Sequence, residues 1–418
     1  MKTLVVDNGG YSIKIGYADG ECRTVPNAVF KSRTDRKRAY ISDQLDELNE
    51  RTGLFYSLPC ERGYLVNWDI QRQIWEHLFT GYQPSETRIA LSDPIYTVPA
   101  INDYSGEILF EDFGFSAVHK SAAPRWIGCA AAAVSSSNRL CLVVDSGYSF
   151  THVVPLLDGQ ILQSGVLRID VGGKVLTNLL KEWISYREIN MREETYVVNE
   201  CKEDCCYVSI DFDIDMKISR LKNETNTIRR EYVLPDFRQN MRGFVRNPVR
   251  EKDDLQKVSM NLERFSLPEV LFKPNDIGID QLGIGEAVVE STKRIHEHLA
   301  PGLLQNIYVV GGSSLFPNFR QRLEREVRSG APDLYGVGLA SIPNPITHAW
   351  TSGAMLAKSD ELPGGFMTRT EYLECGEDFM LEQRFLEFND DPDYAEYLTN
   401  KLTKATSKSD DAFVQSTN

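Results

Sequence analysis

The sequence has little basic charge for its length, and it lacks the long apolar runs of membrane proteins. Its 46 lysines and arginines face 60 aspartates and glutamates, which leaves a formal net charge of −14. Because general affinity for the nucleic-acid backbone needs a surplus of basic residues, direct DNA binding is not expected as the main task. No run approaches bilayer length and the first residues already form a strand, so we expect neither a membrane partner nor a secretory signal.

Familiar nucleotide-binding and catalytic motifs are also missing. No G-x-G-x-x-G leads from a strand into a helix and no G-x-x-x-x-G-K-[ST] occurs, which disfavours a Rossmann site and excludes a P-loop. The chain has six histidines, and nothing around His152 resembles a nucleophile motif. We therefore expect His152 to be a hydrogen-bonded structural residue rather than a general base.

The eight cysteines are scattered, as is typical of reduced thiols in the cytosol or nucleus. Cys201, Cys205 and Cys206 are the exception, because they lie within one predicted helical segment. A metal site is the alternative for this cluster, but it needs further ligands and no histidine lies near. We expect buried thiols.

What the sequence does contain is a repeated phrase. The apolar run Leu142–Val144 ends in Asp145, Ser146 and Gly147, and the chain begins with a similar run that ends in Asp7, Asn8, Gly9 and Gly10. A related phrase, Ile307–Ser313, contains Gly311 and Gly312. Buried strands that end in glycine turns leave backbone N–H groups open to an anion. Taken singly, these are ordinary buried strands; their repetition favours a nucleotide cleft between two similar halves.

Within such a cleft the charged residues have natural roles. Asp7 and Asp145 would hold a magnesium ion through its water molecules, because magnesium prefers carboxylates and retained waters. Lys14 would supply a point charge to the outer phosphate.

The remaining segments are less informative. We expect a helix over most of 193–216 and a long polar surface excursion over 217–262, which is rich in arginine, asparagine and aspartate. The basic stretch in 31–52 is interpreted as a solvated loop, with a nuclear localisation signal as the alternative. The acidic tail from about 389 is expected to be disordered.

Several phrases run in the order found in actin, and the chain resembles the actin family over residues 1–387. They are Asp7–Gly9, Gly63–Asp69, Val144–Gly147, Thr151–Pro155, Arg168–Gly173, Cys206–Val208, Leu234–Asp236 and Gly311–Gly312. The resemblance implies an α/β fold of the actin-like, ribonuclease-H-like duplicated type: two similar lobes around a nucleotide cleft, in four subdomains. It implies a first lobe of 1–137 plus 345–387, with a small subdomain at about 31–62. The second lobe would be 138–344, with a small subdomain at about 174–262 that includes an insertion at 236–260, and 388–418 would be a disordered tail.

The resemblance also implies a site for ATP or ADP with magnesium. Its residues would be Asp7, Asn8, Gly9 and Lys14 in the first turn and Asp145, Ser146 and Gly147 in the second. Lys202 and Glu203 would line the ribose and base, and Gly311, Gly312, Ser313 and Phe316 would close over the adenosine.

The departures from actin point away from catalysis. Gly10 replaces a serine, Tyr11 a glycine and Tyr148 an acid in the two phosphate turns, and Ile346 replaces a lysine that contacts the base. The glutamine that positions the attacking water in actin aligns with Ala123, and no glutamine occurs between Gln83 and Gln160. Since orienting the nucleophile is a large part of phosphoryl transfer, we expect nucleotide binding with slow or absent hydrolysis.

Within the actin family the details resemble nuclear actin-related proteins of SWR-type chromatin remodelling complexes, which exchange canonical histone dimers for the Z-type variant. The resemblance implies a non-catalytic subunit with a remodeller ATPase and other complex subunits as partners, histones or the nucleosome indirectly, and a nuclear location that does not exclude a cytoplasmic pool. A homopolymer is not expected. The alternatives are an ATP-hydrolysing, filament-forming or cytoskeletal actin, a sugar-kinase-like enzyme, and a free-standing chromatin-binding module.

Overall fold

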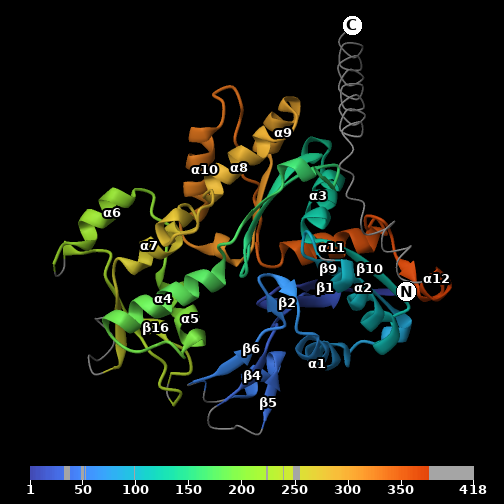
Figure 1. The fold of residues 1–418 in the computed structure, drawn as a ribbon, viewed down its shortest axis with the longest axis horizontal. Helices are drawn as coiled ribbons and strands as arrows, with labels where there is room; N and C mark the ends of the chain where they lie inside the picture. Colours follow the sequence, from blue (N-terminus) through green and yellow to red (C-terminus); the bar gives the residue numbers. More distant parts are fainter. Residues whose placement is uncertain are drawn as a thin grey trace.

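The computed structural model describes residues 1–32, 38–48, 51, 53–97, 99–222, 225–238, 240–247 and 255–375. They form two lobes, each built on one large sheet with helices packed against it (Figure 1). The predicted α/β fold with two similar lobes is therefore confirmed. The predicted tail at 388–418 lies outside the described residues, as do parts of the segments 31–62 and 236–260.

The sheet of the first lobe has the order β19-β10-β9-β1-β2-β3. Its strands are Lys2–Asn8 (β1), Ser12–Tyr17 (β2), Arg23–Pro26 (β3), Thr87–Asp93 (β9), Ala117–Ala122 (β10) and Met367–Thr368 (β19). Leu4, Val5 and Val6 are all fully buried, with Leu4 and Val6 in one hydrophobic cluster and Val5 in another. The uninterrupted apolar run of β1 thus reflects a sheet that is covered on both faces.

The sheet of the second lobe repeats this plan. It has the order β13-β12-β11-β18, with β14 paired to β12. Its strands are Leu140–Ser146 (β11), Thr151–Leu157 (β12), Gln160–Ile161 (β13), Leu167–Ile169 (β14) and Ile307–Val310 (β18). In each lobe the aspartate-bearing strand forms an antiparallel hairpin with the next strand and runs parallel to a third strand on its other side. The duplication expected from the repeated phrase is present in the strand topology.

Helices cover both sheets and join the lobes. They are Trp68–Phe79 (α1), Pro99–Glu107 (α2), Ala123–Val134 (α3), Gly173–Arg187 (α4), Thr195–Cys205 (α5), Phe212–Ser219 (α6), Glu263–Glu269 (α7), Ile284–Lys293 (α8), Ala300–Gln305 (α9), Phe319–Gly330 (α10), His348–Ser359 (α11) and Arg369–Cys375 (α12). The helix α3 packs against α11 and β11, and α11 also packs against β1, so these two helices connect the lobes. Within the described ranges, no helix is both long and apolar enough to cross a bilayer.

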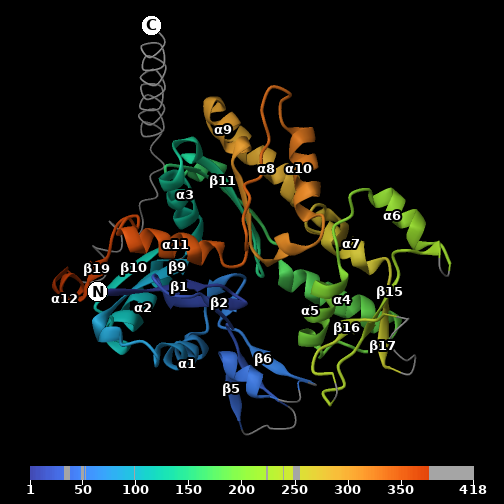
Figure 2. The ribbon, with the colours of Figure 1, turned by 180° about the vertical axis from the view of Figure 1, so that it is seen from behind.

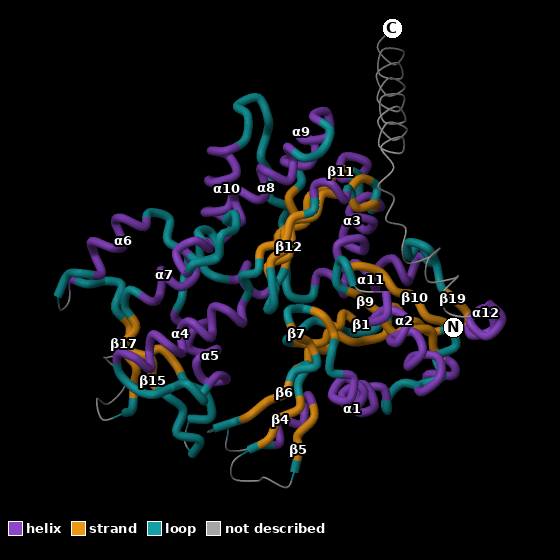
Figure 3. Tube along the Cα trace, in the orientation of Figure 1, coloured by secondary structure: helices purple, strands orange, loops and turns teal. Residues whose placement is uncertain are grey.

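Three small sheets extend the lobes (Figure 3). They are formed by Val29–Lys31 (β4), Ala39–Ile41 (β5) and Phe55–Ser57 (β6); by Cys60–Glu61 (β7) and Tyr64–Leu65 (β8); and by Arg230–Val233 (β15), Phe244–Val245 (β16) and Lys257–Met260 (β17). The last sheet corrects the prediction of a surface excursion over 217–262, because Tyr232, Val258 and Met260 are buried. Of its short strands only β17 alternates polar and apolar residues, so the sequence pattern indicates the buried face of this sheet only weakly. The exact lobe and subdomain boundaries stay a prediction.

The prediction of helix over most of 193–216 is wrong in its middle. Between α5 and α6 the chain is extended, and Val208 donates its backbone N–H to the carbonyl oxygen of Pro317 at 2.9 Å.

The three clustered cysteines are buried. Cys201, Cys205 and Cys206 are each only 2% exposed. The expectation of buried thiols is confirmed.

Candidate functional site

The first turn places Asp7 at the end of β1, opposite Lys14 and Ser92. Its Oδ2 atom lies 3.1 Å from Nζ of Lys14, and its Oδ1 atom accepts a hydrogen bond of 2.7 Å from the hydroxyl of Ser92. The strand register aligns Asp7 with both partners, because β2 pairs with β1 on one side and β9 on the other. Sequence reasoning missed Ser92, although the carboxyl ends of parallel strands meet at one sheet edge.

The side-chain amides of Gln71 and Asn27, both in the first lobe, hydrogen-bond to Asn8 and Gly9. Asn8 donates its Nδ2–H to Oε1 of Gln71 at 3.2 Å, and Asn27 donates its own to the carbonyl oxygen of Gly9 at 2.9 Å. Both Gln71 and Asn27 are fully buried. The first turn is therefore fixed by buried hydrogen bonds.

The second turn brings Asp145 close to the charges of the first. Burial, together with the negative charge of Asp7, raises the pKa of Asp145 to about 6, and the positive charge of Lys14 opposes this shift. Among the described residues the Asp145 carboxylate makes no hydrogen bond or ion pair. Two neighbouring carboxylates with one lysine leave excess negative charge, and this donor set fits a hydrated divalent cation.

Gly311 packs the third glycine turn against the second. Its φ is +89°, and a Cβ there would lie 2.3 Å from the carbonyl oxygen of Ser146 and 3.0 Å from Oδ1 of Asp145. Ser313 donates its hydroxyl to the carbonyl oxygen of Gly147 at 3.4 Å. The structure therefore brings the predicted residues of both turns together, with Gly312 exposed beside them.

Lys202 and Phe316 are engaged within the protein itself. Nζ of Lys202 donates to the carbonyl oxygen of Gly173 at 3.3 Å, Oγ1 of Thr177 at 2.9 Å and Oδ1 of Asn199 at 2.8 Å. An ammonium group has three N–H donors, so none is left for a ribose hydroxyl. Burial lowers the pKa of Lys202 to about 8. Glu203 is exposed and accepts a hydrogen bond of 2.8 Å from Asn199. Its carboxylate remains accessible, and its contact with the ribose or base stays a prediction.

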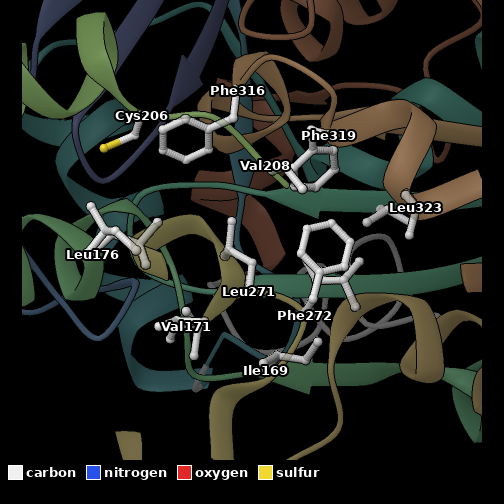
Figure 4. Close-up of a cluster of buried hydrophobic side chains, with 14 of the residues drawn as sticks. Ile169, Val171, Leu176, Cys206, Val208, Leu271, Phe272, Phe316, Phe319 and Leu323 are labelled. Atoms are coloured by element: carbon white, nitrogen blue, oxygen red, sulfur yellow. The ribbon is translucent and has the colours of Figure 1, made fainter. Parts of the chain in front are cut away.

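Phe316 lies in the core of the second lobe. Figure 4 shows its ring beside Cys206 and Val208, and its exposed fraction is 8%. It therefore anchors the turn that carries Gly311 and Gly312. The contact with adenosine stays a prediction.

A tyrosine pair, which we call the tyrosine bridge, connects the two turns. The rings of Tyr11 and Tyr148 have their centroids 4.8 Å apart at an angle of 33°. The hydroxyl oxygen of Tyr148 lies 3.5 Å from that of Tyr56, and Asn199 donates to the hydroxyl of Tyr11 at 3.3 Å. All four side chains line one small, partly open pocket. The bridge links the first lobe to the second through protein contacts alone.

Two further contacts bring the lobes together near the turns. A Cβ at Gly10 would lie 2.9 Å from Oγ of Ser149, so the first turn lies close to the second lobe at this point. Arg168 of the second lobe donates to the hydroxyl of Tyr64 at 3.0 Å and to the carbonyl oxygen of Arg62 at 3.1 Å. The lobes are thus in direct contact at the Arg168 hydrogen bonds as well as at the tyrosine bridge.

We expect Tyr148→Ala to loosen the lobes and to lower the free energy of unfolding by about 1–3 kcal/mol, because it removes the ring that contacts Tyr11 and its buried area. Hydrogen exchange should become faster at residues 9–12 and 195–199, and urea titration should give the loss of stability. Tyr82→Ala is the matched control, since Tyr82 pairs with Tyr17 inside the first lobe, with centroids 5.0 Å apart. Unchanged exchange at the turns in Tyr148→Ala would refute the bridge.

His152 occupies the position in the second hairpin that Lys14 holds in the first. It pairs with Asp145 across β11 and β12 as Lys14 pairs with Asp7. Burial and the charge of Arg168 lower its pKa to about 3, and its Nε2 atom has no hydrogen-bond partner among the described residues. The expectation of a hydrogen-bonded histidine is therefore wrong at Nε2. The first hairpin has a positively charged lysine at this position, whereas the second has a neutral imidazole. The second turn therefore lacks a cation equivalent to Lys14.

The comparisons with known proteins agree with this geometry. The family model described as Actin matches residues 1–386. An actin-like protein of Caenorhabditis elegans is 46% identical over 383 residues, which cover 90% of this chain and 91% of that protein. Actin-related protein 6 of Drosophila melanogaster is 38% identical over 386 residues, covering 89% and 97%. Actin-related protein 6 of Arabidopsis thaliana is 36% identical over 413 residues, again covering 89% and 97%.

Proposed function

The chain belongs to the actin family, and from this premise we propose that it is a non-catalytic actin-related subunit of a nuclear SWR-type chromatin remodelling complex. In this proposal it serves as a structural and assembly component when the Z-type histone variant is deposited, and so in transcriptional regulation. Its partners are the remodeller ATPase and neighbouring subunits, with histones contacted indirectly. Similarity to actin-related protein 6 along most of the chain supports this assignment.

The tyrosine bridge is the observation that carries the non-catalytic part of the proposal. Tyr11 and Tyr148 occupy the two turns in which actin has small or acidic residues, and their rings contact each other. The helix α3 begins with Ala123 where actin supplies the water-positioning glutamine. Gln71 reaches the first turn, but it is fully buried beneath Asn8. A bound ATP or ADP with magnesium would then stabilise the fold by linkage.

We expect the purified full chain to release no phosphate above background in single-turnover assays with ATP and magnesium, because Ala123 stands where actin supplies the glutamine that orients the water molecule. Actin assayed in parallel provides the positive control. Phosphate release at an actin-like rate would contradict the non-catalytic assignment.

The complex itself is tested by affinity purification of the tagged full chain from nuclear extract, followed by identification of the partners by mass spectrometry. We expect a remodeller ATPase and its subunits in stoichiometric amounts. Recovery of homopolymers without remodeller subunits would refute the proposal and favour a filament-forming actin.

A further inference from the structure

A cluster of basic residues, which we call the cationic patch, lies at the outer end of the second lobe, around α6 and the β15–β17 sheet (Figures 1 and 2). It consists of Lys217, Arg220, Lys222, Arg229 and Arg230, all of which are exposed. The only acid in the segment 217–230 is Glu224, although the whole chain has a net charge of −14. Positive charge thus predominates at the C-terminal end of α6, whereas its first turn carries Asp213 and Asp215.

Hydrogen bonds hold the segments of the patch together. Asn226 and Asn261 both donate to the carbonyl oxygen of Ser219, at 3.0 and 2.9 Å. Arg229 donates through Nε to the hydroxyl of Ser259 at 2.9 Å. The C-terminal end of α6, the start of β15 and the end of β17 therefore form one continuous surface.

Most of this charge is available to a partner. The side chains of Lys217, Arg220 and Lys222 make no hydrogen bond or ion pair within the part of the chain that the structure describes. Arg230 donates hydrogen bonds to two backbone carbonyl oxygens, at 2.8 and 2.9 Å. Within the described residues its guanidinium group therefore has no carboxylate that neutralises its charge. Burial, together with the charge of Arg230, lowers the pKa of Arg264 beside the patch.

Exposed aliphatic side chains lie between these cations. Ile214 is 52% exposed, Leu221 48% and Leu262 38%. Ile214 and Lys217 are three positions apart in α6 and share one helix face, and Leu262 follows the asparagine that binds Ser219. A site for a phosphate backbone needs no such apolar anchors, whereas protein interfaces use them for affinity.

We propose that the cationic patch and its aliphatic neighbours dock an acidic protein segment that carries aliphatic or aromatic side chains between its carboxylates. The positive charges would steer and orient the segment, and the apolar contacts would hold it. This inference is independent of the proposed function, since it concerns a surface remote from the cleft.

The test uses the full chain and a set of fluorescent 15-residue peptides in which aspartate and glutamate alternate with leucine, phenylalanine or tryptophan. We expect micromolar binding of a subset of these peptides by anisotropy, weakening as salt is raised. The triple variant Lys217→Glu, Arg220→Glu and Lys222→Glu should bind at least tenfold more weakly. Its matched control carries the same charge change at three exposed sites elsewhere, Lys293→Glu, Lys358→Glu and Arg369→Glu, and should bind as the unmodified chain does.

The apolar contribution is tested by Leu221→Ser with Leu262→Ser, which should weaken peptide binding at least threefold at unchanged thermal stability. Peptides with serine in place of every apolar residue should bind more weakly by a similar factor. Equal binding by those serine peptides, by a 30-base-pair DNA duplex or by phosphatidylserine vesicles would overturn the proposal. No binding by any peptide, or undiminished binding by the charge-reversed chain, would also overturn it.

Discussion

We expect Gly311→Ala to lower the free energy of unfolding by about 2–4 kcal/mol and to remove any nucleotide binding. Two independent causes act at this position. The backbone φ of +89° is unfavourable for a residue with a Cβ, and that Cβ would lie 2.3 Å from the carbonyl oxygen of Ser146. Because the neighbouring atom belongs to the backbone of the second turn, relief requires a shift of that turn together with Asp145.

Gly312→Ala is the matched control, since a Cβ at Gly312 meets no heavy atom within 4 Å and the residue does not need a positive φ. Urea titration and thermal unfolding should show a large loss for Gly311→Ala and less than about 0.5 kcal/mol for Gly312→Ala. Equal effects of the two substitutions would mean that Gly311 is not the contact between the turns.

The turns themselves could be predicted from the sequence because their signal is local. An apolar run that ends in an aspartate and glycines specifies a buried strand and a tight turn within a few residues, as at Asp7 and Asp145. The repetition then indicated two similar halves, and the strand topology of both lobes confirms it. The structure adds the register, which places Lys14 and His152 in equivalent positions.

The contacts across the cleft could not be predicted in this way. The sequence shows Tyr11 and Tyr148 as departures from actin, but the contact between their rings depends on how two segments far apart in the sequence come together. The same is true of Lys202, whose three acceptors lie on α4 and α5. The β15–β17 sheet was missed for a different reason: its strands are short, and charged residues occupy most of their outer positions.

These contacts change the physical role of the site. In a cleft that a nucleotide alone holds closed, the lobes separate when the nucleotide leaves. Here the tyrosine bridge and the Arg168 contacts connect the lobes without any ligand. The carboxylates nevertheless remain, and the charge of Lys14 only partly offsets the effect of burial and of Asp7 on the pKa of Asp145. The donor set of the site therefore still suits a cation, while protein contacts also connect the two lobes.

The second large prediction follows from the electrostatic cost of ionising Asp145. The pKa of Asp145 rises from its ordinary value of 3.8 to about 6 in the folded chain. A carboxyl group whose folded pKa is raised favours folding while it is protonated, and this stability is lost as the pH rises from about 4 through 6. We therefore expect Asp145→Asn to raise the free energy of unfolding by up to about 3 kcal/mol above pH 7 in the presence of EDTA, and to change it little near pH 4. Urea titrations across this pH range provide the measurement.

The same variant separates an electrostatic cost from a metal site. Magnesium with ATP at a hundred times its Kd should stabilise the unmodified chain by about 2.7 kcal/mol, and EDTA should reverse this. Asp145→Asn should lose that response, because it removes a carboxylate that would hold the hydrated ion. Burial raises the pKa of Asp170, but its hydrogen bonds with Arg168 and Gln281 outweigh burial and lower that pKa. Asp170→Asn is therefore the control of opposite sign, and it should lower the free energy of unfolding at neutral pH. If Asp145→Asn proves less stable at neutral pH without metal, the carboxylate has a stabilising partner and the cleft is not poised for a cation.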